Sequence, residues 1–133
     1  MLSESRVEAN IPAADIDRAK AFYADKLGLT PSAEPFPGYA RYETSNGTAF
    51  NLYQTQYAGT AGHTIAQIHV QDVEKEVGDM KARGVAFEVY DDMPGVEWRG
   101  EVAVMPEMGK AAWFKDSEGN ILCVDEPAAG LGA

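Results

Sequence analysis

Apolar and polar positions along the chain follow a pattern that occurs twice. Residues 8–16 and 65–73 each form an extended segment with an aspartate near its end, in the position of a helix N-cap. Apolar residues then recur on one helical face until a glycine stops the pattern, Gly28 in the first half and Gly84 in the second. Each half of the chain is therefore predicted to open with a strand and a helix.

The two halves also close alike. Residues 40–52 match residues 112–124, and in both segments strand-like alternation surrounds a turn, Ser-Asn-Gly or Ser-Glu-Gly, in which glycine supplies a positive φ. Further short strands are expected at 30–34 and 85–90. The pattern thus predicts two β-α-β-β-β modules.

The modules span about residues 6–56 and 63–126. Because the whole chain has 133 residues, and a domain typically has roughly 150, we expect residues 1–133 to form a single domain. The predicted fold class is α+β, with mostly antiparallel sheets.

About fifteen additional residues, 91–105, distinguish the second half from the first. Loops of this length are often binding loops or lids, and Trp98 would then cover a flat ligand. The segment is equally compatible with a solvated connection that contains a short strand at 101–105, where Trp98 would patch the sheet edge.

Charge and composition exclude several classes of partner. Eleven Lys and Arg against 21 Asp and Glu give a net charge of −10, which is the wrong sign for binding nucleic acid or an anionic membrane surface. A single cysteine, Cys123, excludes a disulfide framework and suits a reducing compartment. With no apolar leader or membrane-spanning run, a cytoplasmic location is expected.

Specific motifs accompany the duplication. The first helix carries Arg-Ala-Lys-Ala-Phe-Tyr at 18–23 and is followed by Leu-Gly-Leu at 27–29, and the second hairpin contains Phe-Lys-Asp-Ser-Glu-Gly-Asn at 114–120. This combination resembles the vicinal oxygen chelate superfamily, which includes glyoxalase I, extradiol dioxygenases, fosfomycin-resistance enzymes and bleomycin-resistance proteins. The resemblance implies curved half-barrel sheets with helices outside, a ligand in the concave cleft, and a homodimer.

Strand alternation divides the residues into a helix side and a cleft side. The helix-side sets are uniformly apolar, whereas the cleft-side sets are mixed, as expected for a pocket. We therefore expect a ligand pocket with Trp98 at its rim and the following lining residues: Glu8, Asn51, Tyr53, Ile65, Gln67, Phe114 and Cys123.

Four of these positions correspond to those at which metal-dependent members of the superfamily bind one divalent ion. They are Glu8, Asn51, Ile65 and Cys123. Only Glu8 is a conventional ligand for a hard metal, and it could equally pair with Arg6 or Arg41. Cys123 has no basic neighbour in sequence and is expected to be an inert thiol.

These observations favour a metal-independent protein that binds a small organic molecule, in the manner of bleomycin-resistance proteins, with no cofactor. An acidic protein favours neutral or cationic ligands. Whether a reaction is catalysed is left open. The alternative is a glyoxalase-type lyase or a dioxygenase with a divergent metal site, in which a strand bulge brings His63 beside Glu8.

Overall fold

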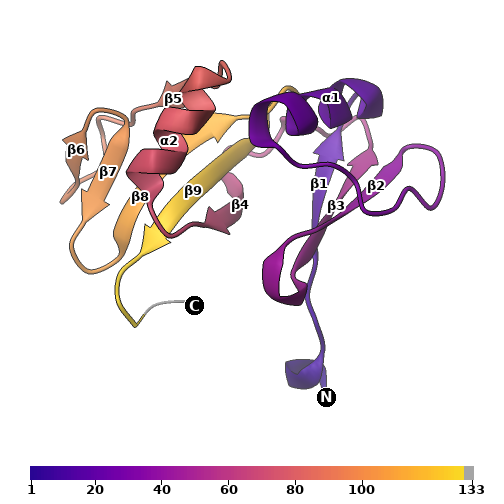
Figure 1. The fold of residues 1–133 in the computed structure, drawn as a ribbon, viewed down its shortest axis with the longest axis horizontal. Coiled ribbons are helices and arrows are strands. Elements are labelled where there is room, and N and C mark those ends of the chain that lie inside the picture. Colours follow the sequence, from indigo (N-terminus) through magenta and orange to yellow (C-terminus); the bar gives the residue numbers. More distant parts are fainter. Residues whose placement is uncertain (131–133) are drawn as a thin grey trace.

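The chain folds into two β-sheets, each of which packs against one helix (Figure 1). This computed structural model describes residues 1–130, so residues 131–133 of the expected domain lie outside the described residues. The first sheet has the order β1-β3-β2, and the second has the order β4-β9-β8-β7-β6, with β5 also paired to β8. The strands are β1 Ala9–Ala13, β2 Tyr39–Glu43, β3 Ala49–Gln54, β4 Thr64–His69, β5 Phe87–Glu88, β6 Glu97–Arg99, β7 Val102–Met105, β8 Gly109–Lys115 and β9 Ile121–Pro127. The helices are α1 Ile16–Leu27 and α2 Val73–Ala82, with 3-10 turns η1 Leu2–Glu4 and η2 Ser45–Gly47.

The internal duplication is visible in the strand pairing. In each half the first strand runs parallel to the last, β1 beside β3 and β4 beside β9. The last strand in turn pairs antiparallel with the strand before it, β3 with β2 and β9 with β8. The two mixed, unclosed sheets and their helices confirm the α+β fold class.

Both helices begin where the aspartates predict. The Asp15 carboxylate accepts hydrogen bonds from the backbone N–H groups of Asp17 and Arg18, and Asp72 accepts one from Lys75. Such caps satisfy N–H groups that have no partner inside the helix. Gly28 ends α1 in the left-handed region at a φ of 70°.

The expected second strand is absent from the first half and shortened in the second. Residues 30–34 form no strand, because Pro31 and Pro35 lack the N–H groups that a ladder needs. Only one isolated bridge remains in this segment, between Ala33 and Arg41. In the second half, the prediction for 85–90 reduces to β5. The hairpin β6–β7 is the cause, since β7 occupies the rest of the β8 edge to which β5 pairs.

The hairpin β6–β7 is formed by the additional segment 91–105. A strand predicted at 101–105 is present as β7, and β6 precedes it. The extra residues therefore extend the second sheet by two strands.

One hydrophobic core fills the space between the helices and the sheets. Buried residues of α1 and α2 pack against the inward side chains of both sheets. Tyr23 of α1 contacts Tyr42 of β2 and Phe50 of β3, with ring centroids 5.8 and 6.0 Å apart. The opposite, helix-free faces of the two sheets are left to carry polar and aromatic side chains.

A buried turn between β8 and β9 joins the second half of the chain to the first. Asp116 accepts a hydrogen bond from the Tyr23 hydroxyl of α1 over 2.7 Å. Asn120 donates to Asp116 over 2.9 Å and to the carbonyl oxygen of Pro12 over 2.7 Å. Because these groups are buried, each needs such a partner to offset its desolvation.

Glu118 of the same turn makes the second set of contacts. Its carboxylate accepts hydrogen bonds from Nε and Nη2 of Arg18 at 2.8 and 2.9 Å, and from the backbone N–H of Asp15 at 2.9 Å. A bidentate guanidinium pair of this kind holds both partners in one orientation. The turn thus fixes the start of α1.

Within the described residues, neither helix is long and apolar enough to cross a membrane.

The two buried tyrosines of the core provide a matched test of this junction. Removing the Tyr23 hydroxyl in Tyr23→Phe leaves buried Asp116 with one bond fewer, so we expect the free energy of unfolding to fall by about 1–3 kcal/mol. The Tyr42 hydroxyl is equally buried and has no hydrogen-bond partner among residues 1–130. Tyr42→Phe removes a buried hydroxyl that lacks a partner, so it should cause no loss of stability and is expected to leave the free energy of unfolding unchanged or to raise it. Urea denaturation of both variants checks this, and equal losses would contradict it.

Acid should loosen the junction through Glu118. Burial by itself would raise the pKa of Glu118, but the bonds from Arg18, Asp15 and Ser117 outweigh it and lower the pKa from its ordinary 4.5 to about 2. Since the folded-state pKa is the lower one, the carboxylate stabilises the fold above about pH 4.5, and this contribution is lost as the pH falls toward 2.

We expect the contribution to be about 2 kcal/mol, because the half-exposed Arg18 is partly screened by solvent. Glu118→Gln should remove this pH dependence. The measurement is the unfolding free energy of wild type and variant between pH 5 and pH 2. Parallel pH curves for the two proteins would show that Glu118 does not titrate as described.

Candidate ligand-binding site

The helix-free face of the first sheet carries a polar cluster around Glu8. The Glu8 carboxylate accepts hydrogen bonds from Arg41 at 3.2 Å and from the Asn51 amide at 3.3 Å, and it pairs with Arg6 at 3.3 Å. Asn51 also donates to Asn10 at 3.1 Å. Of the two predicted roles for Glu8, the structure therefore shows the salt bridge, with both arginines.

Asn51 lies beneath this cluster and is nearly inaccessible, with 5% of its surface exposed. Its Oδ1 atom has no hydrogen-bond partner within residues 1–130. An enclosed acceptor of this kind costs stability. The structure thus brings Glu8 and Asn51 together, as predicted, but Asn51 forms the floor of the cluster.

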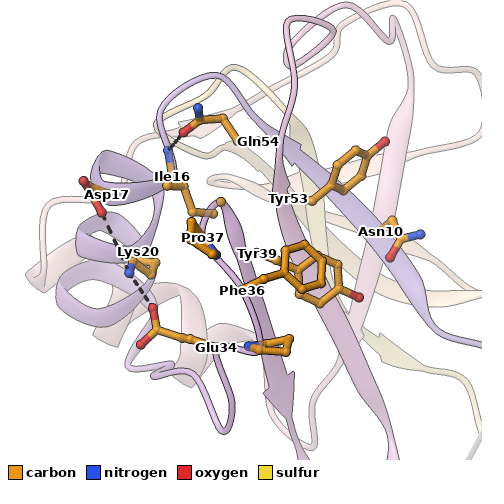
Figure 2. A pocket seen from close by; sticks show the side chains of 12 residues that line it. Asn10, Ile16, Asp17, Lys20, Glu34, Phe36, Pro37, Tyr39, Tyr53 and Gln54 are labelled. Atoms are coloured by element: carbon orange, nitrogen blue, oxygen red, sulfur yellow. Dashed lines mark hydrogen bonds and ion pairs between the residues drawn. The ribbon is translucent and has the colours of Figure 1, made fainter.

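A cavity of about 1110 Å³ opens beside this cluster, at the N-terminal end of α1 (Figure 2). One wall is aromatic: Phe36 packs on Tyr39 with ring centroids 4.7 Å apart, and Tyr53 lies on the neighbouring strand. Phe36 is 58% exposed and Tyr53 38% exposed. These rings are available for contact with a ligand. Tyr53 lies on the helix-free face, as predicted.

The other end of the cavity is charged. The Lys20 ammonium lies between Asp17 and Glu34, as Figure 2 shows, so two carboxylates surround one cation. The lining of this end has an excess of one negative charge. Cationic groups are favoured there over anionic ones.

The helix-free face of the second sheet carries a second aromatic surface. Trp113 of β8 lies at its centre, with Trp98 of β6 at 6.1 Å and Tyr90 at 5.7 Å between ring centroids. The Trp113 indole N–H donates to the Thr64 hydroxyl over 3.1 Å. Burial, together with the bond to Glu88, raises the pKa of Tyr90 to about 12, so its phenol stays neutral. We call Tyr90, Trp98 and Trp113 the indole surface.

Phe114 does not line the cleft, which corrects the sequence-based prediction. It pairs with Leu122 and lies in the core against Phe87, whereas Trp113 pairs with Cys123 on the helix-free face. The reason is the turn: Asp116 bonds to Asn120 across three residues, ending in Gly119 at a φ of 84°. A two-residue turn would have placed Phe114 opposite Cys123, on the cleft side. The additional turn residue shifts the pairing by one residue and puts Trp113 opposite Cys123 instead.

Ile65 is also displaced from its predicted position. The pairing of β4 with β9 is interrupted by a bulge between Thr64 and Ala66, and Ile65 packs against the hydrophobic core. Thr64, whose hydroxyl bonds to Trp113, takes the place on the helix-free face. The bulge that the sequence allowed therefore exists, but it presents Thr64, and His63 lies exposed before the strand.

Cys123 lies on the expected face beside its β4 partner Gln67, beneath the indole surface. The thiol is fully buried. Burial, and secondarily the charge of Asp125, raise the pKa of Cys123 to about 12. The thiol is therefore protonated at neutral pH and unsuited to nucleophilic attack or metal binding.

The four positions that the resemblance to the vicinal oxygen chelate superfamily marks as metal ligands do not form a metal site here. Glu8 is held by two arginines and Asn51 is enclosed. Ile65 is partly buried and packs against the core, and Cys123 is a buried neutral thiol. Divalent ions of the hard type need several accessible oxygen or imidazole donors. The residues present do not fit such an ion.

One acidic cluster outside these positions, Asp72, Glu74 and Glu126, brings three carboxylates close together among the described residues. Glu126 accepts a hydrogen bond from the backbone N–H of Val73, and Glu74 pairs with Lys110. These contacts explain the cluster as a cap at the start of α2.

Sequence reasoning missed the aromatic residues Phe36, Tyr39 and Trp113 as site residues. Phe36 sits between two prolines, in a segment with no strand or helix periodicity to place it. The position of Trp113 on the helix-free face could have been predicted from the sequence, since a three-residue turn ending in glycine is a common hairpin connection.

One family model matches the N-terminal part of the chain. Residues 7–45 match the family model described as bleomycin resistance protein-like N-terminal. Among curated protein sequences, none matches the chain significantly.

Solved structures share the fold over nearly the whole chain. A bleomycin-binding protein complexed with bleomycin is 17% identical with a TM-score of 0.68, over 93% of this chain and 99% of that one. An antibiotic-binding protein from Streptomyces sp. CB03234 is 20% identical with a TM-score of 0.64, over 96% and 100%. Lactoylglutathione lyase from Agrobacterium tumefaciens is 17% identical with a TM-score of 0.68, over 92% and 93%. The chain thus has the fold of the bleomycin-resistance and glyoxalase proteins, which confirms its resemblance to the vicinal oxygen chelate superfamily.

Proposed function

We propose that this protein binds small, flat organic molecules, neutral or cationic, without a metal ion. The observation that carries the proposal is the cavity of about 1110 Å³ with its aromatic wall, in which Phe36 and Tyr53 are exposed and Tyr39 is partly exposed. Binding cavities of this size with aromatic walls and a few polar groups suit drug-sized ligands. The proposal is also supported by the fold, which is shared with proteins described as binding bleomycin or an antibiotic.

The indole surface supplies a second place for a ring to stack. Trp98 and Trp113 are partly exposed and lie at a tilt to each other, 6.1 Å apart. Aromatic pairs contribute about 0.5–1.5 kcal/mol beyond the area they bury. Trp98 is thereby proposed as a ligand contact. Gln67, two strands from Trp113 on the same sheet face, is proposed as a hydrogen-bonding group.

Charge selects among flat ligands. The net charge of −10 and the two carboxylates around Lys20 oppose an anionic ligand. The ligand class that fits best is therefore an uncharged or cationic aromatic molecule. The expected homodimer and cytoplasmic location stay predictions.

A thermal-shift experiment tests the ligand class. Proflavine, a planar cation, and 2-naphthol, a neutral ring, should raise the melting temperature, because a ligand that binds only the folded state stabilises it. Naphthalene-1,5-disulfonate, a planar dianion, should not. Stabilisation by the dianion alone would contradict the proposal.

Variants locate the binding surface in the same assay. Phe36→Ala removes the ring at the cavity and Trp98→Ala removes one at the indole surface. At least one of these should weaken binding about tenfold, by the loss of a stacking contact and its buried area. Tyr57→Ala is the control, since Tyr57 is an exposed ring on the connection between the sheets. Unchanged affinity in both test variants would rule out these surfaces.

Metal independence has a direct test. Protein purified without a histidine tag should contain far less than one equivalent of transition metal per chain, and chelator treatment should leave proflavine affinity unchanged. The reason is the donor set, in which Glu8 is already paired and Cys123 is buried. One equivalent of slowly exchanging Ni, Zn or Fe that is lost in Glu8→Ala would instead favour the metal-dependent alternative.

A further inference from the structure

A row of directly paired residues crosses the helix-free face of the second sheet. Trp98 of β6 pairs with Ala103, Ala103 with Ala111, and Ala111 with Asp125. Asp125 in turn pairs with His69 on the edge strand β4. Paired residues place their side chains on the same face of a sheet, so the row runs from the indole surface to a histidine.

The end of this row is an oriented acid–imidazole pair. The Nδ1 atom of His69 lies 2.8 Å from Oδ1 of Asp125. The Asp125 side chain is only 12% exposed, whereas the His69 side chain is 53% exposed. A carboxylate can only accept a hydrogen bond, so the bond assigns the proton of a neutral imidazole to Nδ1 and leaves Nε2 as an acceptor.

The pair lies within reach of a ligand on the indole surface. Trp113 pairs with Cys123, and Cys123 with Gln67, in the row next to that of Asp125 and His69. The strands of Trp113 and His69 are therefore two apart, which corresponds to about 10 Å across the sheet. A molecule of two or three fused rings has this length.

We propose that the Asp125–His69 pair recognises a hydrogen-bond donor, a hydroxyl or N–H group, on the flat ligand that stacks on the indole surface. The proposal rests on the proposed function, since it requires a ligand on Trp113 of the indole surface. It adds a chemical requirement: the donor lies at the end of the ring system remote from Trp98, where Nε2 of His69 accepts its proton in a hydrogen bond. Asp125 is a positioning residue that keeps the imidazole in the accepting tautomer.

Two ligands that differ only in the donor provide the probe. 2-Naphthol carries a hydroxyl, and 2-methoxynaphthalene has the same ring and oxygen without the donor. We expect wild-type protein to bind 2-naphthol about fivefold more tightly, the usual contribution of one hydrogen bond. Titration followed by tryptophan fluorescence measures both affinities.

Two substitutions at His69 distinguish the hydrogen-bonding roles of its two ring nitrogens. His69→Asn places an amide near the Nδ1 position, so the bond to Asp125 is kept but no group reaches the ligand. The variant should then bind 2-naphthol and 2-methoxynaphthalene with about equal affinity. His69→Gln places an amide near the Nε2 position and should keep part of the preference. His63→Gln is the matched control, because His63 is the other histidine and lies in the exposed connection.

The outcomes separate this inference from the proposed function. If His69→Asn keeps the fivefold preference, or if wild type binds both naphthalenes equally, the recognition role of His69 is wrong while ring binding stands. If wild type binds neither naphthalene, both proposals are contradicted. Should His69→Asn fail to fold by circular dichroism, His69→Ala replaces it with the same expected loss.

Discussion

The buried turn between β8 and β9 is the interaction on which the rest of the molecule depends. Asp116, Glu118 and Asn120 carry polar groups into the junction between the two halves, where water cannot solvate them. Each group therefore needs a hydrogen-bond partner. These partners come from the first half of the chain: Tyr23, Arg18 and the Pro12 carbonyl. An unpaired carboxylate at this place would cost several kcal/mol. The junction thus specifies how the halves meet.

This constraint also positions the candidate site. Asn120 holds the carbonyl of Pro12 on β1 and accepts a hydrogen bond from the backbone N–H of Gly59 on the connection between the sheets. Glu118 holds the start of α1, which borders the cavity. The walls of the cavity are consequently tied to the second half of the chain by hydrogen bonds, although its aromatic lining comes from the first half.

The two halves of the duplicated fold carry different side chains on their helix-free faces. On the first sheet the helix-free face carries a cluster of paired charges, in which Glu8 is paired with arginine and Asn51 lies underneath. On the second sheet the extra hairpin β6–β7 adds Trp98 beside Trp113 and shortens β5, because both compete for one edge of β8. The first face is thus dominated by paired charges and the second by aromatic rings. This arrangement fits ligand binding by stacking and hydrogen bonds.

The sequence by itself determined the local features that depend on short-range periodicity. The two helices with their aspartate caps and the polar face with Glu8, Asn51 and Tyr53 follow from patterns within about fifteen residues, and the duplication follows from comparing such local patterns along the chain. Only the tertiary structure decided which side of a strand Phe114 and Ile65 face, because a three-residue turn and a bulge each shift the register by one residue. It alone also brought Phe36 to the cavity and Asp125 to His69. Those contacts join segments far apart in the chain, and no local periodicity encodes them.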